Sequence, residues 1–530
     1  MTRQLTRGIG AIMGSAALLA VGACADLEIT NPNNPDIERA LASPEDVINI
    51  ANSTIFNWYR SATYIYPFTT LSVAGDVHTS NFGNFGMRFS NVEPRIAYDN
   101  NSAGADADVA RLPWANAYAD LGLGNDVMIA LNAGVSLGSP ADDAKYAALA
   151  QFTQAASLTS LAWNFDKAFV VDENTDLSQP AQAVPYQEVA AAAEARWDAL
   201  ISALGSQDNT YDTDVLPLAS GDGEYSLNAP VRTITLTSSV LAQISNTMAA
   251  RLLAYTPRNA AENSSVNWSK VLQYAEKGIS APSNRFDMGV PQDGGTKWYS
   301  YIMYYGAEKS WLRIDMRLIN MMDPSVPAKY AGTMVTPGDS PDARYASDFG
   351  YDGVVEGDVA RGVYMQSPYW HKRYSFGARL SPTLLQGTHP FILAAENDLL
   401  IAEALIRTGG DLGRAASLIN NSRVGRGHLP AASASEGAEK LLEYLFYERQ
   451  VELTTTGAIE FYDMRRFDKL QPLAWRHLPI PARELETLNE PIYTFGGADN
   501  PSMRRSLPAG LALRLQQSLP KSALFERPIR

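Results

Sequence analysis

The chain has 530 residues, a formal net charge of −14 and a single cysteine. Its length suits two or three average domains or one large helical domain, and its acidic balance argues against nucleic acid and anionic membrane surfaces as partners. One cysteine excludes an internal disulfide, so we expect a packed core to stabilise the fold.

An export signal is predicted at residues 1–23. Arg3 and Arg7 supply a positive flank, and residues 9–20 form an apolar stretch too short to span a bilayer. A Val-Gly-Ala sequence directly before Cys24 matches the lipobox of bacterial lipoproteins, in which the thiol is acylated. The alternative is an ordinary secretory signal followed by an unrelated cysteine. Because residues 1–23 hold two arginines and no acidic residue, cleavage leaves 41 basic and 57 acidic residues, a net charge of −16.

Residues 24–40 are predicted to form the lipidated tether, because the stretch 26–35 is dense in Asn and Pro. Paired helical periodicities follow in the N-terminal part, residues 41–280. A helix is predicted to start at Pro113 and its partner to begin at Lys145, and similar pairs follow. These patterns predict a helical-repeat scaffold.

The periodicity breaks down in residues 281–388, where Gly, Pro and Asp become frequent and aromatic residues gather. A long irregular stretch inside a compact protein is usually functional or disordered, and the aromatic content argues against disorder. We therefore expect a binding surface in this loop-rich part.

Helical spacing returns in the C-terminal part, residues 389–530. Apolar residues recur in steps of three and four from Ile392 to Ile406, and Gly409 is predicted to cap this helix. Helix pairs with small residues on their packing faces are typical of tetratricopeptide-like repeats, although no exact repeat length is visible. The predicted fold class is mainly α: a tetratricopeptide-like helical-repeat scaffold with a loop-rich, irregular ligand-binding region.

Short blocks follow one another in this last part: FILAAE and LIAEA within 391–404, NNSRVGRG at 420–427, YERQVEL at 447–453, FYDMRRF at 461–467 and HLPIPAREL at 477–485. Their order and spacing, with the lipobox and the Asn-Pro tether, resemble the SusD/RagB family. Departures at 454–457 and 459–460 concern packing positions. The resemblance covers most of the mature chain and is weakest between residues 281 and 389.

The resemblance implies a non-catalytic lipoprotein without a cofactor. Family members capture a nutrient, commonly a glycan, and form a lid over a TonB-dependent, SusC-like transporter in the outer membrane. The chain would then be anchored through Cys24 and face the cell exterior. A peptide-binding member of the same family, a lipid-anchored glycoside hydrolase and a protein-binding scaffold remain as alternatives.

Saccharides present apolar C–H faces and hydroxyl rims, so their binding sites combine aromatic rings with side chains that form paired hydrogen bonds. Two stretches offer such sets, and the family takes its ligand contacts from the corresponding regions. The predicted ligand residues are Asp76, His78, Asn81, Phe82, Phe85 and Arg88 after Gly75, and Trp298, Tyr299, Tyr301 and Trp311 in the loop-rich part. Core packing is the alternative for each aromatic residue.

No catalytic or metal-binding motif is recognised, so no catalytic residue, metal ligand or cofactor is predicted. The five histidines lack zinc-site spacing, and the acidic stretches 172–176 and 208–214 lack EF-hand spacing and are interpreted as solvated loops. The Gly-x-Gly sequences at 122–124 and 425–427 lack the third glycine of a dinucleotide loop. We interpret both as helix ends.

Charged residues are frequent in the last motifs. Glu448 and Glu452 are four residues apart and share a helix face, while Arg449, Arg465 and Arg466 offer donors to carboxylates. They are interpreted as a buried ionic network that ties the last helices together; a catalytic acid pair is the alternative.

Overall fold

The computed structural model describes residues 41–498, apart from residues 177, 180–181, 226–228, 282–283, 294–296, 308–310 and 376–385. The predicted signal peptide, Cys24 and the tether lie outside the described residues. None of the helices in the described ranges has the length and apolar character needed to cross a membrane.

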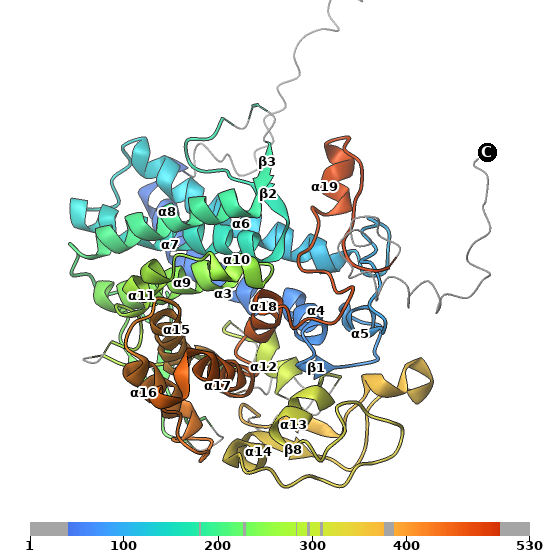
Figure 1. Cartoon of the computed structure of the whole chain (residues 1–530). Helices are drawn as coiled ribbons and strands as arrows, with labels where there is room; N and C mark the ends of the chain where they lie inside the picture. Colours follow the sequence, from blue (N-terminus) through green and yellow to red (C-terminus); the bar gives the residue numbers. More distant parts are fainter. Residues whose placement is uncertain are drawn as a thin grey trace, which may run out of the picture.

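Helices dominate the first half of the structure. They are α3 (Pro44–Ala62), α4 (Ile65–Ala74), α5 (Met87–Asn91), α6 (Asp108–Asn132), α7 (Pro140–Asn164), α8 (Tyr186–Leu204), α9 (Ser238–Tyr255), α10 (Ala260–Ser264) and α11 (Trp268–Ala275). Helix α6 packs on α7, α7 on α8 and α8 on α9. Helix α3 packs on α6 and α7, and α11 packs on α9, so these helices form one stack (Figure 1). The stack has a continuous apolar core that includes Phe152 and Trp197.

Shorter elements follow. The helices are α12 (Tyr301–Gly306), α13 (Met316–Met322), α14 (Ala343–Asp348), α15 (Ala394–Arg407), α16 (Leu412–Arg423), α17 (Gly437–Glu452), α18 (Ile459–Arg466) and α19 (Ala482–Thr487), with 3-10 turns η1 (Val359–Arg361), η2 (Val363–Met365) and η4 (Ala434–Glu436). In Figure 1, α13 and α14 lie with β8 (Phe349–Tyr351) at the lower edge, below α17.

The strands are short. They are β1 (His78–Thr79), β2 (Lys167–Phe169), β3 (Ala183–Pro185), β4 (Leu218–Ser220), β5 (Arg232–Ile234), β6 (Met288–Asp293), β7 (Arg313–Ile314), β9 (Tyr369–His371) and β10 (Gln386–Ile392), besides β8. One sheet has the order β10-β6-β4-β5, while β1 pairs with β7, β2 with β3 and β8 with β9, all antiparallel. The prediction of a mainly α fold with an irregular, loop-rich part is confirmed.

Some details of the first helices differ from the prediction. Pro113 does not start its helix, because α6 begins at Asp108 and holds this proline within its second turn. The glycines at 122 and 124 also lie inside α6 instead of ending it. A Cβ atom on Gly124 would lie 2.8 Å from Cγ of Gln154, so glycine at this position permits the close approach of α6 and α7.

The later helix ends agree with the prediction. Gly409 has φ +67°, and the N–H of Gly410 donates to the carbonyl of Leu405 at 2.8 Å, which caps α15. The Gly-Arg-Gly sequence at 425–427 follows directly on α16.

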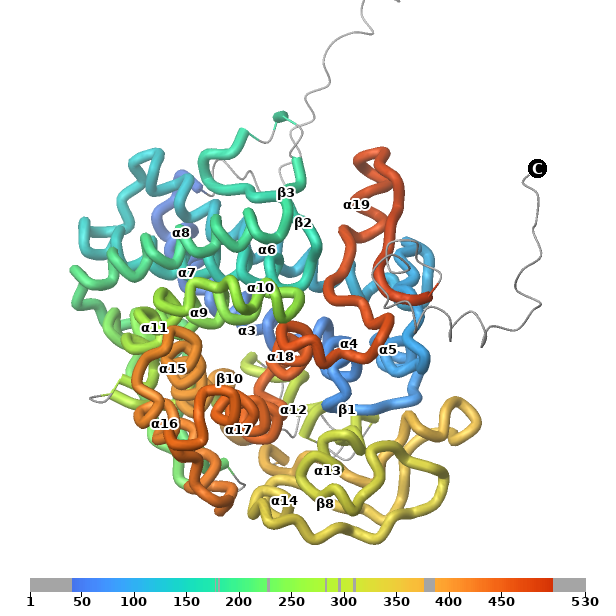
Figure 2. The backbone as a smooth tube through the Cα atoms, in the orientation of Figure 1, coloured from blue at the N-terminus to red at the C-terminus, as the bar shows by residue number. Residues whose placement is uncertain are grey.

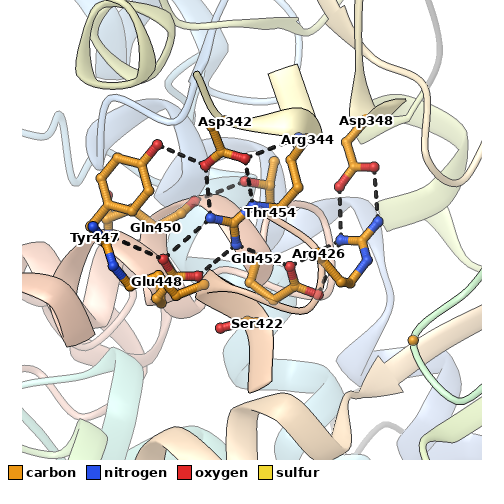
Figure 3. A network of polar contacts seen from close by, with 12 residues as sticks. Asp342, Arg344, Asp348, Ser422, Arg426, Tyr447, Glu448, Gln450, Glu452 and Thr454 are labelled. Atoms are coloured by element: carbon orange, nitrogen blue, oxygen red, sulfur yellow. Dashed lines mark hydrogen bonds and ion pairs between the residues drawn. The ribbon is translucent and has the colours of Figure 1, made fainter. Parts of the chain in front are cut away.

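A buried ionic network joins the loop-rich part to α17 (Figure 3). Arg344 of α14 pairs with Asp342 at 2.8 Å, with Glu448 at 2.7 Å and with Glu452 at 3.2 Å. Arg426, which follows α16, pairs with Glu452 at 2.9 Å. The Arg426 side chain is partly exposed, whereas those of Asp342, Arg344, Glu448 and Glu452 are buried. The interpretation of Glu448 and Glu452 as members of a buried ionic network is therefore confirmed. Their partners include Arg344 of α14 and Arg426, whereas the predicted Arg449 and Arg466 pair with Asp463.

A second buried network lies between α15, α17 and α18. Asp463 accepts from Arg449 and from Arg466, each at 2.8 Å, and Arg466 also pairs with Glu403 at 2.6 Å. Although burial opposes it, Arg466 lowers the pKa of Glu403 to about 2. Arg465 differs from the prediction, because it donates to the backbone carbonyls of residues 163, 255 and 476.

Candidate functional site

The pairing of β1 with β7 brings together the two stretches that the sequence singles out. His78 lies opposite Ile314 and Thr79 opposite Arg313 in this ladder. The loop after β1 consequently lies beside Trp311, which precedes β7, and beside α12. Figure 2 shows β1, α4 and α12 as neighbours, although more than 200 residues separate β1 from α12 in the chain.

Aromatic rings from three segments form a row at this junction, which we call the aromatic strip. Its members are Tyr64, Phe82, Phe85, Tyr301, Tyr305 and Trp311, all partly exposed. The rings of Phe82 and Trp311 are 5.4 Å apart and inclined by 27°, and those of Phe85 and Tyr305 are 5.6 Å apart. Tyr301 stacks on Tyr305 at 6.3 Å and 11°, and contacts Tyr64 at 5.1 Å. Successive ring contacts therefore connect the members of the strip from Tyr64 to Phe82.

The backbone at Phe85 is held in an unusual conformation. Phe85 has φ +55°, a backbone conformation that residues other than glycine rarely adopt. Its carbonyl accepts hydrogen bonds from the hydroxyls of Thr69 at 2.9 Å and Thr70 at 3.2 Å. The next residue, Gly86, has φ +69°, and a Cβ atom there would lie 2.7 Å from a methyl group of Val109. These contacts fix the Phe85 ring in the strip.

Polar groups flank one end of the strip. Asn84 and Arg88 are exposed, and the Arg88 guanidinium lies near Gly83, where a Cβ atom would be 3.2 Å from Nη2. Burial raises the pKa of Asp106, and the charge of Arg88 opposes that rise. Burial also raises the pKa of Tyr305 to about 12, so its hydroxyl stays protonated at neutral pH. Donors and acceptors thus stand beside the rings.

Three polar residues predicted to bind the ligand support the loop instead. Asp76 is only 5% exposed, pairs with Arg95 at 2.5 Å and accepts from Gln471 at 2.8 Å. His78 bonds Ser72 through Nδ1 and the carbonyl of Gly306 through Nε2, and burial lowers its pKa to about 4. Asn81 is buried and donates to the carbonyl of residue 358 at 2.6 Å. Their side chains are engaged within the protein.

Trp298 and Tyr299 also lie beneath the surface. The Trp298 ring is 5% exposed and contacts Phe56 at 5.0 Å and Tyr59 at 5.3 Å. Tyr299 is 4% exposed and meets Tyr301 edge to face at 4.7 Å. For these two residues, the structure supports core packing.

The structure therefore brings Phe82, Phe85, Tyr301 and Trp311 together, with Arg88 nearby. Tyr305 was visible in the sequence as part of the aromatic stretch before Trp311. Tyr64 was missed, because nothing in the local pattern at the end of α3 distinguishes it from a core tyrosine.

Two carboxylates of the acidic stretch 172–176 form ion pairs with one arginine. Asp172 and Glu173 pair with Arg196 of α8 at 2.9 and 3.0 Å. Within the described ranges, no group of three or more His, Cys, Asp or Glu side chains is placed to hold a metal ion.

The sequence matches no protein-family model and no curated protein. Solved structures do resemble the chain. One is a SusD homolog from Bacteroides thetaiotaomicron VPI-5482, at a TM-score of 0.59 and 12% identity, covering 87% of this chain and 98% of that one. A SusD superfamily protein from Bacteroides vulgatus ATCC 8482 has a TM-score of 0.57 and 16% identity, with 84% and 97% covered.

A third similar structure is surface glycan-binding protein A from Bacteroides uniformis, with a TM-score of 0.55, 15% identity and coverage of 84% of this chain and 98% of that one. The structural neighbours are consistently SusD-like proteins that are covered over most of their length. The chain has the SusD-like fold, and the resemblance seen in the C-terminal motifs is confirmed at the level of the fold.

Proposed function

We propose that this protein is a non-catalytic cell-surface lipoprotein of the SusD/RagB family that captures an oligosaccharide on the aromatic strip. The observation that carries the proposal is the meeting of Phe82 and Phe85 with Tyr301, Tyr305 and Trp311, which come from two stretches far apart in the chain. Partly exposed rings in a row suit a ligand with several flat apolar faces.

The chemistry of sugars fits this arrangement. The C–H faces of successive sugar units can lie on aromatic rings, while their hydroxyls exchange hydrogen bonds with amides and guanidinium groups. Asn84 and Arg88 are exposed beside the strip and supply such groups. The similar structures include a surface glycan-binding protein from Bacteroides uniformis and a SusD-like carbohydrate binding protein from Bacteroides fragilis, which supports the same ligand class here.

Anchoring and delivery complete the proposal. The lipobox at Cys24 would attach the protein to the outer membrane by lipid, with the body facing the cell exterior. The captured glycan would pass to a TonB-dependent, SusC-like transporter beneath it. The division into an N-terminal helical-repeat part, a loop-rich part and a C-terminal part at residues 280/281 and 388/389 is part of this proposal.

Calorimetry on the protein without residues 1–24 tests the ligand class. The panel consists of malto-, cello-, xylo-, manno- and chitooligosaccharides and basic peptides. We expect saturable binding to one glycan series and weaker binding after Phe82→Ala. The matched control is Phe446→Ala, which removes a partly exposed ring that packs on Phe467 at 5.3 Å, outside the strip.

Three outcomes would contradict the proposal. Binding of peptides alone would assign a peptide-capturing role. Release of new reducing ends from the bound glycan would assign a hydrolase. Equal effects of Phe82→Ala and Phe446→Ala would move the binding site away from the aromatic strip.

A further inference from the structure

A groove between α3 and α6 continues the aromatic strip. Tyr64 belongs to both, because its ring contacts Tyr301 of the strip at 5.1 Å and also lines the groove. On the α3 side the groove is lined by Phe56, Asn57, Arg60 and Tyr64, and on the α6 side by Asn116 and Asp120. A ligand chain that leaves the strip at Tyr301 therefore meets this groove next.

Phe56 supplies an apolar face in the groove. Its ring is partly exposed and stands nearly perpendicular to the buried ring of Trp298, at 5.0 Å and 78°. The guanidinium of Arg60 and the ammonium of Lys297 lie 5.8 and 6.0 Å from its centre. Trp298 thus supports the groove from below, although it is itself buried.

Planar polar groups with unused hydrogen-bonding capacity surround this ring. Asn57 donates its amide to the carbonyl of Ser53 at 2.9 Å, which leaves its side-chain oxygen available. Arg60 uses one nitrogen for the carbonyl of Lys297 at 3.2 Å. Asn116 is partly exposed and makes no side-chain hydrogen bond to any part of the chain that the structure describes. An amide whose carbonyl oxygen and NH₂ group are both free can accept a hydrogen bond from one sugar hydroxyl and donate one to its neighbour.

Asp120 is the acidic residue of the groove. It is 4% exposed, interacts with Ser61, and also lines a second cavity, whose walls include Trp58, Phe68 and Trp163. Burial raises the pKa of Asp120 to about 7, and the hydrogen bond with Ser61 opposes the rise. Near neutral pH this carboxyl group can therefore donate as well as accept a hydrogen bond.

We propose that the α3–α6 groove is a second saccharide subsite, which binds sugar units of the same glycan chain beyond those held on the aromatic strip. The proposal rests on the function proposed above. The ring of Phe56, the amides of Asn57 and Asn116 and the carboxyl group of Asp120 repeat the combination of apolar face and paired donors and acceptors that sugars require. Tyr64 makes the two surfaces continuous.

Chain length provides the test. Disaccharides and heptasaccharides of the glycan series that binds are compared by calorimetry for Asn116→Ala, Asn116→Trp and Trp311→Ala. The control is Asn132→Ala, which alters an exposed asparagine at the end of the same helix. Because Asn116 is partly exposed and without a partner in the described part, its replacement leaves the fold intact, which a thermal melt checks.

Asn116→Ala is expected to weaken heptasaccharide binding about tenfold and to leave disaccharide binding within about twofold of the parent. Asn116→Trp, which fills the groove, is expected to weaken heptasaccharide binding further, while Trp311→Ala weakens both lengths. If both Asn116 variants leave heptasaccharide affinity unchanged while Trp311→Ala lowers it, the second subsite is overturned and the strip stands. If no glycan binds, or Trp311→Ala changes neither length, the proposed function fails and the subsite with it.

Discussion

The ionic network around Arg344 and the aromatic strip use residues of opposite kinds in opposite surroundings. Arg344, Glu448 and Glu452 are charged but fully or almost fully buried, whereas Phe82 and Trp311 are apolar but partly exposed. A buried charge must have a partner of opposite sign in a fixed position, since leaving it unpaired is very unfavourable. A partly exposed ring has no such requirement, so a ligand can cover it.

This contrast separates the positions that stabilise the fold from those that we propose bind the ligand. Changes in the network should reduce stability, and changes in the strip should reduce affinity while the fold persists.

Arg344→Met removes the cation shared by three buried carboxylates. The carboxylates of Asp342, Glu448 and Glu452 would then lose the positive charge that they share. The free energy of unfolding should therefore fall by about 3–5 kcal/mol. Urea unfolding at neutral pH, followed by circular dichroism, measures the loss. Arg361→Met, at an exposed arginine in the same part of the chain, is the control and should change stability by less than about 0.5 kcal/mol. Equal losses in the two variants would show that the network does not stabilise the fold.

Trp298→Ala deletes a buried ring beneath the proposed binding surface. It should lower the free energy of unfolding by about 3 kcal/mol, because the contacts with Phe56 and Tyr59 are lost and a cavity remains. Thermal and urea unfolding measure this effect. A Trp298→Ala protein that keeps the parent's stability and yet loses all affinity for glycan would place Trp298 in the binding site and contradict its assignment to the core.

Trp311→Ala is the counterpart at the surface. Its ring is partly exposed and stacks with Phe82, so its removal should weaken glycan binding by about 2 kcal/mol, or roughly thirtyfold. The accompanying loss of stability should be smaller than for Trp298→Ala. Calorimetry and urea unfolding on the same two proteins give both quantities. A reversed order of the two stability losses would contradict the distinction between strip and core.

The sequence was most informative where burial and pairing restrict the choice of residue. The blocks that hold Glu448, Arg449 and Arg466 identified the fold, because each charge has a defined partner inside it. The pairing of Glu448 with Arg344 could not be predicted, since Arg344 comes from an irregular segment about a hundred residues earlier.

The site could be predicted only as two stretches of chain. Burial decides whether an aromatic residue belongs to the core or to the surface, and it depends on tertiary contacts: Trp298 and Trp311 lie thirteen residues apart in the sequence, yet one is buried and the other partly exposed. The two-residue β1–β7 ladder that joins the stretches is too short to leave a periodic signal in the sequence. Asp76 and His78 have the polar side chains that a ligand site needs, and those same side chains fix the loop through Arg95 and Gly306.

His78 connects the two kinds of region, because it is buried and polar and holds β1 to the end of α12 beneath the strip. Burial lowers its pKa to about 4 from 6.5, so the unfolded chain binds a proton at higher pH than the folded chain does. The stabilising effect of a neutral His78 is complete above pH 6.5 and is lost as the pH falls toward 4. At pH 5 the parent should therefore have lost about 1–2 kcal/mol more stability, relative to neutral pH, than His78→Gln, which does not titrate. Urea unfolding of both proteins between pH 7.5 and 4.5 measures that difference. If the free energy of unfolding changes equally with pH in the two proteins, protonation of His78 does not affect stability.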